Sequence, residues 1–448
     1  MRSPSSRGAR SPWAWLLAKE WRELVASRAW WVLLVAMGPL VGVSFTSAVR
    51  TYADLSGLHG TTAGVGEAFS PLIGVWAPTF SACELAAAFL LPFVAIRLVS
   101  ADRRSGALKL ELQHAMSSFG RLSAKVLVLL AGWCIALLPA VIAIILWRSY
   151  GGSLYPPEFV PLILGHLLNA ALMIALGAAA AALTEHPSTA AIATLAVTVS
   201  TWIVNFVAAV QGGIWERLAG YTPTAIVAEF QHGLVRLDVV LIALALSVFG
   251  VALAAIWTRL GVAVRRRVWE SVAAGAITAA VVIFAASFAS ASWDASENRT
   301  NSFTRAQEAA LVQIRAPLRI EVHLAPEDPR RVDFDRRVIA RLRRVLRSLR
   351  VDYIAATTTG LFEQTADRYG EMWYEIDGRR VMNRATTAES ALDTIFSLAG
   401  VTPGAEREDE IFRGHPLAAP PTGAAAVFYG VWPAVVVASA WFIRWRQS

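Results

Sequence analysis

Eight stretches of about 20 mostly apolar residues constrain this chain more than any other feature. A helix needs about 20 such residues to cross the hydrocarbon core of a bilayer. The composition agrees, because 56% of the residues are hydrophobic and 17% are charged, whereas soluble domains carry about a quarter charged residues. The sequence therefore predicts a polytopic membrane protein whose spans are 30–48, 81–99, 126–147, 160–183, 190–210, 239–257, 271–290 and 424–443.

Basic residues predict the orientation of these spans. The net charge is +8, and many of the positive charges flank apolar segments, which is typical of a membrane protein and not of a nucleic-acid-binding surface. Short loops rich in arginine and lysine face the cytoplasm. Both termini are therefore expected in the cytoplasm, as an even number of spans requires, and the predicted inner segments are 1–28, 97–125, 184–188, 259–267 and 444–448.

The chain carries no recognisable catalytic or metal-binding motif. An ATPase needs a GxxxxGK[ST] loop to hold phosphate, and no lysine (Lys19, Lys109, Lys125) follows a glycine. HExxH and GxSxG motifs are also missing. Cys83 and Cys134 lie in apolar runs far apart, which indicates small buried residues without a disulfide framework. We expect neither an enzyme nor a cofactor or metal in this chain, and no cleavable signal is expected at its beginning.

Two shorter segments have amphipathic patterns outside the spans. Residues 13–28 place tryptophans and leucines on one helical face and charges on another, which predicts a helix lying in the membrane interface. Residues 212–237 are too polar to span and favour a short re-entrant or interfacial pair of helices.

Between 293 and 421 the composition becomes that of a soluble domain. A capping box, Thr304 to Gln307, predicts a helix, and residues 318–324 alternate as a strand. An amphipathic helix is expected over 333–350, followed by a second strand in 351–356. Asp377-Gly378 predicts a hairpin turn, and Gly400 ends a last helix. These elements predict a small α/β domain.

A cluster of charges separates the second and third predicted spans. In a helix, Leu108, Leu112 and Met116 form one stripe flanked by Lys109, Glu111 and Gln113. Such an element can dock into a partner's groove while its charges fix the register. An ordinary interfacial helix held by lipid headgroups is the alternative.

The sequence around this segment resembles a known family. "LLAKEWRELVASRAWW" and "LLPFVAIRLVSADRRSGALKLELQHAMSSFGRLSAKVLVLL" are similar to permease subunits of ABC transporters of the type-2 exporter class. In that family the cytoplasmic loop forms a coupling helix seated in the ATP-binding subunit. The positions that match the family pattern are Asp102, Arg103, Arg104, Gly106 and Lys125, while Ala107 and Ala115 stand where threonine and proline are usual.

The soluble region also resembles a transporter component. "NRTNSFTRAQEAALVQIRAPLRIEVHLAP" and "YEIDGRRVMNRATTAESALDTIFSLAGV" are similar to the auxiliary, so-called substrate-binding component of gliding-motility-type ABC transporters, which commonly ends in one membrane anchor. The resemblances imply a cytoplasmic N-terminus with an interfacial helix (1–29), a six-helix permease domain (30–270), a seventh span (271–292), an extracytoplasmic auxiliary domain (293–421) and a C-terminal anchor (422–448).

The implied function is a multi-pass permease of the bacterial cytoplasmic (inner) membrane. A separate ATP-binding subunit would bind ATP and magnesium and hydrolyse the ATP. The permease would work as a homodimer or with a sister permease, in contact with membrane lipid, and its outer domain would bind substrate or an envelope partner. The alternative is a non-transporting membrane sensor or scaffold with an extracytoplasmic ligand-binding domain.

Polar residues within spans and arginines on the domain complete the candidate sites. Charged and polar groups inside a membrane usually face a cavity or a partner, so Glu84, His166, Asn169 and Asn205 are candidates for a substrate path, with hydrogen bonding between helices as the alternative. Arg337, Arg341 and Arg344 are candidates for contact with anionic lipid or a polyanion, with an ordinary solvated face as the alternative.

Overall fold

The computed structural model describes residues 12–55, 70–105, 116–211, 213–326, 328–346, 348–354, 368–404, 415, 417 and 422–447. Among these residues, eight helices are long and apolar enough to cross a membrane. Each coincides with one predicted span, so the prediction of a mostly helical protein with eight apolar helices of spanning length and a small sheet is confirmed. The eight helical spans are 28–55, 72–102, 118–149, 156–183, 187–211, 237–257, 264–288 and 424–446.

Several spans are longer than their apolar cores predicted. The first, α2 (Arg28–Leu55), continues beyond the apolar run, and the second begins at Leu72 instead of residue 81. Proline divides two of the spans into segments, because its ring cannot continue the preceding hydrogen-bonding pattern. The second consists of a π-helical turn (Leu72–Trp76), α3 (Ala77–Phe89) and α4 (Leu91–Ser105); the third consists of α6 (Ser118–Ala136) and α7 (Leu138–Ser149).

The remaining spans are each formed mainly by one helix. They are α8 (Phe159–Leu183, preceded by a 3-10 turn at Pro156–Glu158), α9 (Pro187–Gln211), α12 (Leu237–Trp257), α13 (Val264–Phe288) and α19 (Trp432–Gln447, preceded by α18, Ala424–Ala426, and a π-helical turn, Val427–Val431). Among the described residues of α13 only Ala285 is buried. This helix packs along α12, where Trp257 donates to Ser271, and much of its remaining surface is exposed.

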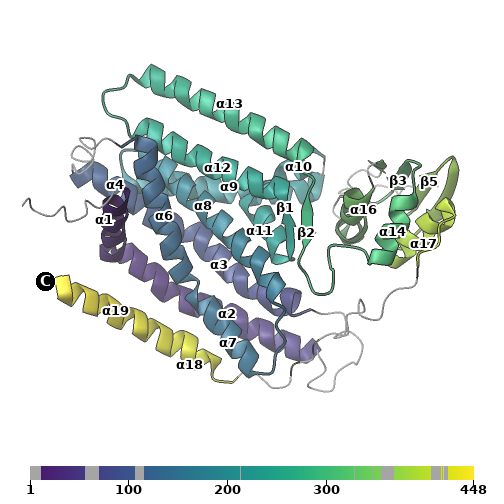
Figure 1. Cartoon of the computed structure of the whole chain (residues 1–448), viewed down its shortest axis with the longest axis horizontal. Coiled ribbons are helices and arrows are strands. Elements are labelled where there is room, and N and C mark those ends of the chain that lie inside the picture. The colour runs from purple at the N-terminus through teal and green to yellow at the C-terminus, as the bar shows by residue number, and fades with distance from the viewer. Residues whose placement is uncertain are drawn as a thin grey trace, which may run out of the picture.

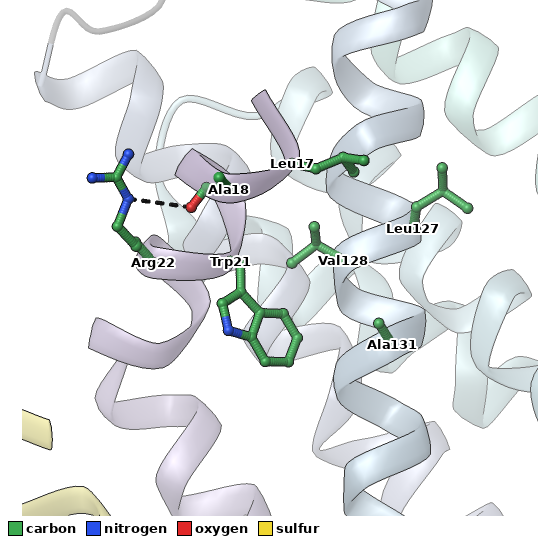
Figure 2. A pocket seen from close by; sticks show the side chains of 7 residues that line it. All are labelled: Leu17, Ala18, Trp21, Arg22, Leu127, Val128 and Ala131. Carbon is green, nitrogen blue, oxygen red and sulfur yellow. Dashed lines mark hydrogen bonds between the residues drawn. The ribbon is translucent and has the colours of Figure 1, made fainter. Parts of the chain in front are cut away.

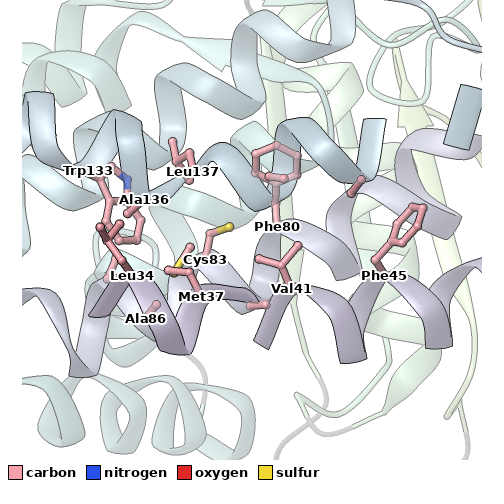
Figure 3. Packing of buried hydrophobic residues seen from close by; sticks show 14 of the residues in the cluster. Leu34, Met37, Val41, Phe45, Phe80, Cys83, Ala86, Trp133, Ala136 and Leu137 are labelled. Atoms are coloured by element: carbon pink, nitrogen blue, oxygen red, sulfur yellow. The ribbon is translucent and has the colours of Figure 1, made fainter. Parts of the chain in front are cut away.

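The bundle core includes large side chains of the first three spans, together with residues of the fourth and the last. Figure 3 shows Met37 and Val41 of α2 beside Cys83 of α3, with Trp133 of α6 close by. Trp133 has no exposed surface. Dispersion contacts of this kind hold helices together where lipid removes the hydrophobic driving force between them.

The last span packs on the first through two glycines four residues apart. A Cβ atom on Gly38 would lie 2.4 Å from Trp432 Cδ1, and one on Gly42 would lie 2.5 Å from Phe428 Cβ. The indole Nε1 of Trp432 donates to the Leu34 carbonyl oxygen at 2.7 Å. Close approach at small residues is a common way for membrane helices to associate. The last span therefore packs against the bundle and does not merely anchor the α/β domain.

The segment between the fifth and sixth spans forms two short helices, as predicted. They are α10 (Ile214–Ala219) and α11 (Pro223–Gln231), followed by β1 (Leu234–Arg236). The sequence did not predict that β1 pairs antiparallel with β2 (Ser292–Asp294). This pairing joins the start of the sixth span to the end of the seventh.

The α/β domain has a four-stranded sheet with the order β4-β3-β5-β6. β3 and β4 are parallel and the other pairs are antiparallel. One face of the sheet is buried under helices, with Ile320 and Tyr374 fully covered. The elements are α14 (Arg305–Gln313), β3 (Leu318–Val322), α15 (Pro329–Phe334), a π-helical turn (Asp335–Ile339), α16 (Ala340–Val345), β4 (Leu349–Tyr353), β5 (Met372–Ile376), β6 (Arg379–Asn383) and α17 (Ala388–Ala399).

The capping box, the hairpin turn and the C-cap predicted for this domain are confirmed, but the end of one predicted helix is wrong. The Thr304 capping box forms, Asp377 and Gly378 turn the hairpin with positive φ angles, and Gly400 caps α17 in the left-handed conformation. The helix predicted over 333–350 is wrong at its C-terminal end, because it stops at Val345 and β4 already begins at Leu349. Leu349 pairs with Leu318 of β3, and this tertiary pairing outweighs the helical periodicity.

Figure 1 shows the two ends of the bundle. α1 (Pro12–Ala26), the turn between α12 and α13 and the C-terminus lie at one end, and the α/β domain lies at the other. At the domain end, the Glu297 backbone N–H donates to Glu158 at 2.8 Å and the Tyr52 hydroxyl donates to the His415 carbonyl at 2.7 Å. The domain is therefore attached to the bundle by polar contacts as well as by the chain.

Candidate functional site

A buried cluster of charges lies where three helices meet at the end of the bundle opposite the α/β domain. α1 supplies Lys19, Glu20 and Glu23, the last turns of α4 supply Asp102, and α6 supplies Lys125. The position of α1 follows from its sequence, because Leu16, Glu20 and Leu24 recur every four residues and are its buried residues. A carboxylate thus occupies the middle of the stripe that α1 buries.

The Lys125 ammonium lies among three carboxylates. Its Nζ atom is 2.5 Å from Glu20 Oε2, 2.7 Å from Asp102 Oδ2 and 3.8 Å from Glu23 Oε2. Lys19 completes the cluster from the outside, with its Nζ atom 3.1 to 3.6 Å from oxygens of Glu23, Glu20 and Asp102. One lysine therefore joins two consecutive spans to the helix that precedes the first.

Burial makes this cluster energetically significant. The side chains of Glu20, Lys125 and Asp102 are 0%, 5% and 6% exposed. Burial raises the pKa of Glu20, and the charge of Lys125 opposes that shift. Removing one partner of such a buried pair leaves an uncompensated charge and costs about 3–5 kcal/mol. The cluster therefore holds α1, α4 and α6 together; we call this contact the joint.

The same carboxylates have the spacing of a cation site. Ligand oxygens of Glu20, Glu23 and Asp102 all lie within 4.8 Å of one another. Because Lys125 contacts all three, its ammonium group takes the position that a metal ion would need. Three carboxylates and two lysines leave the cluster one negative charge in excess when all are ionised.

The structure brings together two of the residues predicted to couple the chain to an ATPase. Asp102 and Lys125 contact each other directly, although 23 positions of the chain separate them. Arg103 and Arg104 belong to the last turn of α4, but their side chains are outside the described part of the structure, as are Gly106, Lys109 and Glu111.

Sequence reasoning missed Lys19, Glu20 and Glu23 as members of this cluster. The available signal was the position of Glu20 on the same helical stripe as Leu16 and Leu24. A charge on the buried stripe of an amphipathic helix needs a partner. That partner, Lys125, is far away in the sequence and could not be identified from periodicity.

An apolar groove lies beside the cluster, between α1 and α6. It has a volume of about 800 Å³ and is lined by Leu17, Ala18, Trp21, Arg22, Leu127, Val128 and Ala131. Figure 2 shows the Trp21 indole and the Arg22 guanidinium on α1, with Arg22 Nε donating to the Ala18 carbonyl at 3.2 Å. Exposed tryptophan and arginine beside an apolar groove are typical of a helix at a membrane surface.

The polar residues within the spans divide into separate environments. Glu84 and Asn169 line one cavity of about 170 Å³. His166 is fully buried one turn before Asn169, with its ring centroid 5.1 Å from that of Phe80. Asn205 is elsewhere and forms a 3.0 Å hydrogen bond with Thr222, the N-cap of α11. Of the four predicted substrate-path residues, the structure brings only Glu84 and Asn169 into one cavity.

The arginines of the α/β domain also differ in their environments. Arg337 is exposed, whereas Arg341 donates to the backbone carbonyls of Thr300 and Ser302, and Arg344 donates to that of Asn301. Burial, more than the neighbouring arginines, lowers the pKa of Arg341 to about 10, so this side chain remains protonated at neutral pH. Arg341 and Arg344 hold the loop that connects the domain to the seventh span, while Arg337 remains open to a partner.

Comparison with protein-family models, curated proteins and solved structures finds no match for this chain.

Proposed function

We propose that this protein is the transmembrane permease subunit of an ATP-binding-cassette transporter. It moves a substrate across the cytoplasmic membrane with ATP that a separate subunit hydrolyses. In this proposal the chain works as a dimer, with itself or with a sister permease, above two ATP-binding subunits. The α/β domain lies on the extracytoplasmic side, where it binds or transfers substrate or recruits an envelope partner.

The observation that carries the proposal is the buried contact between Asp102 and Lys125. Asp102 lies at the end of the second span and Lys125 near the start of the third, and the charged segment 103–117 connects them. A partner that pushes on this segment acts on two spans whose ends are joined to each other and, through Glu20, to α1. Such a joint supports rigid-body transmission of a displacement into the bundle.

The distribution of arginines supports the cytoplasmic assignment of that end. The end with α1 also carries Arg259, Arg265, Arg266 and Arg267 around the α12–α13 turn, and Arg444 and Arg446 near the C-terminus. The positive-inside rule assigns the arginine-rich side of short loops to the cytoplasm. An ATP-binding subunit would be found on that side.

Affinity purification of the full chain from its native membrane tests the proposal. We expect an ATPase with a phosphate-binding loop to co-purify with the chain. Arg104→Glu should release this ATPase, because the substitution reverses a charge in segment 103–117, the proposed docking segment. Arg265→Glu is the matched control, since it reverses an exposed arginine at the same end of the bundle. Intact protein that co-purifies with no ATPase would contradict the permease and favour the sensor or scaffold.

A second measurement separates docking from transmission. Lys125→Met removes the joint without changing the docking segment, so the ATPase should remain bound while its activity no longer responds to the permease. Loss of the ATPase from Lys125→Met but not from Arg104→Glu would contradict the assigned roles.

A further inference from the structure

The cavity that contains Glu84 and Asn169 lies at the side of the bundle. Its lining comes from α3, α8, α9 and the start of α11. Leu85 and Trp202, on α3 and α9, line it and are 42% and 44% exposed. The cavity is therefore open between these two helices, on a surface that lipid would cover in a membrane.

The polar groups of this cavity are mainly hydrogen-bond acceptors. The hydroxyl groups of Ser81, Thr198 and Thr201 all donate to backbone carbonyls of their own helices, at 2.9, 3.0 and 2.7 Å. Their oxygen lone pairs are left for other partners. The Glu84 carboxyl adds two more acceptor oxygens, and none of the described residues that line the cavity is a lysine, an arginine or a histidine.

Asn169 supplies an independent sign that the cavity can bind a polar ligand. It is 2% exposed, it lines the cavity, and neither its amide nitrogen nor its amide oxygen has a hydrogen-bond partner among the described residues. A buried polar group without a partner costs about 1–3 kcal/mol. A ligand with a polar group at this position would recover that cost.

The N-terminus of α11, which borders the cavity, does not replace a cationic partner for Glu84. α11 begins at Pro223, which has no N–H group, and the Thr222 hydroxyl accepts from the Ala225 N–H. A helix N-terminus is equivalent to roughly half a positive charge at most. When it is ionised, the Glu84 carboxylate has Gln231 as a neutral hydrogen-bond partner but no cationic partner among the described lining residues, although charges in an apolar setting are usually paired.

We propose that this cavity binds the ammonium group of an amphiphilic amine, whose apolar chain extends between α3 and α9 into the lipid. The ammonium group donates to Glu84, Asn169 and the hydroxyl oxygens, and the indole of Trp202 at the opening provides the aromatic face that cations prefer. The volume of about 170 Å³ holds a headgroup and the first carbons of a chain. As a substrate site it rests on the proposed transport function; as a binding site it does not.

Calorimetric titration of the full chain in phosphatidylcholine nanodiscs tests the assignment, with hexylamine as the probe, 1-hexanol as its neutral counterpart and empty nanodiscs subtracted. We expect saturable hexylamine binding and at least tenfold weaker hexanol binding, because the charge-assisted hydrogen bond is lost. Glu84→Gln should weaken hexylamine binding at least tenfold and leave hexanol binding unchanged. Glu185→Gln, which alters an exposed carboxyl between α8 and α9, is the matched control.

Other outcomes overturn the assignment. Equal binding of hexylamine and hexanol would mean that only the apolar surface binds them. Unchanged hexylamine affinity in Glu84→Gln would place the amine elsewhere. Should Glu84→Gln fail to fold, Asn169→Ala must weaken hexylamine binding several-fold, or the site is not the one described. Absent amine binding in a protein that co-purifies with an ATPase removes only this inference, while amine binding without an ATPase removes only the proposed transport function.

Discussion

The Lys125 Nζ atom lies 2.7 Å from Asp102 Oδ2 and 2.5 Å from Glu20 Oε2, with all three side chains nearly inaccessible to solvent. This contact joins the second and third spans to α1 at the end of the bundle opposite the α/β domain. It connects the two sides of the segment through which a partner is proposed to act. The stability of the protein and the proposed coupling between the ATPase and the bundle should therefore both depend on Lys125.

Lys125→Met should destabilise the protein by about 3–5 kcal/mol, because it leaves the buried carboxylates of Glu20 and Asp102 with only the longer contacts of Lys19 as counter-charge. Lys19→Met is the matched comparison, since Lys19 is 16% exposed and its contacts are longer; we expect a loss of about 1 kcal/mol. The free energy of unfolding of purified protein, from detergent-induced denaturation, measures both. Equal losses would contradict the dominant role of Lys125, and adding Glu20→Met to Lys125→Met should recover part of the stability.

Gly42→Ala and Gly430→Ala should change stability in opposite directions. Alanine normally stabilises a helix by about 0.5–1 kcal/mol relative to glycine, and a Cβ atom on Gly430 would meet no described residue within 4 Å. On Gly42 it would lie 2.5 Å from Phe428 Cβ, so overpacking should cost about 1–3 kcal/mol. Thermal unfolding of the two variants compares them. Stabilisation by Gly42→Ala would show that the π-helical turn before α19 does not pack closely on α2.

Arg341→Met should loosen the loop at 300–302, because methionine fills similar space but cannot donate to the Thr300 and Ser302 carbonyls. Each lost charged hydrogen bond is worth about 1.5–3 kcal/mol. We expect amide hydrogen exchange in this loop to accelerate about tenfold or more. Arg343→Met, at an exposed position of the same helix, should leave exchange unchanged, and similar rates in the two variants would contradict the role of Arg341.

Asp328→Asn should destabilise the α/β domain by about 1 kcal/mol in weakly acidic solution. The Arg330 side chain, aided by its backbone N–H and by Tyr369, lowers the pKa of Asp328 to about 2. A carboxylate whose pKa is lower in the folded state stabilises that state above the unfolded pKa of about 4. This contribution is lost as the pH falls from about 4 to about 2.

Pepsin digestion provides the measurement for Asp328→Asn, because pepsin is active throughout this pH range. The variant should be digested faster than the wild type at pH about 4, and the two should become alike as the pH reaches about 2. A difference that persists unchanged at the lower pH would mean that the charge of Asp328 is not responsible.

Much of the architecture could be predicted because its signals are local. Runs of apolar residues specify helices that can cross a membrane, and each of the eight predicted runs is helical. Asp377-Gly378 and Gly400 determine their turns because few residues adopt positive φ angles without strain. The helix expected over 333–350 fails where its final turn competes with a strand partner, Leu318, which lies on a distant part of the chain.

The candidate site was predicted only in part for the same reason. Asp102 and Lys125 were singled out by a resemblance, but their mutual contact and the part played by Glu20 depend on how α1 packs against α4 and α6. Likewise, the sequence indicates Glu84 and Asn169 only as polar residues within apolar segments. Only helix packing brings these two to one cavity and leaves Asn205 with Thr222.

The sequence by itself determined the number of apolar helices, the small α/β domain and the caps and turns, because hydrophobic periodicity and backbone preferences act over a few residues. The tertiary structure alone decided which charges form ion pairs, that the Asn169 amide has no hydrogen-bond partner among the described residues, and that the last span packs on Gly38 and Gly42. Those outcomes depend on contacts between residues far apart in the chain. The energetic effect of a buried charge or polar group depends on the groups that surround it.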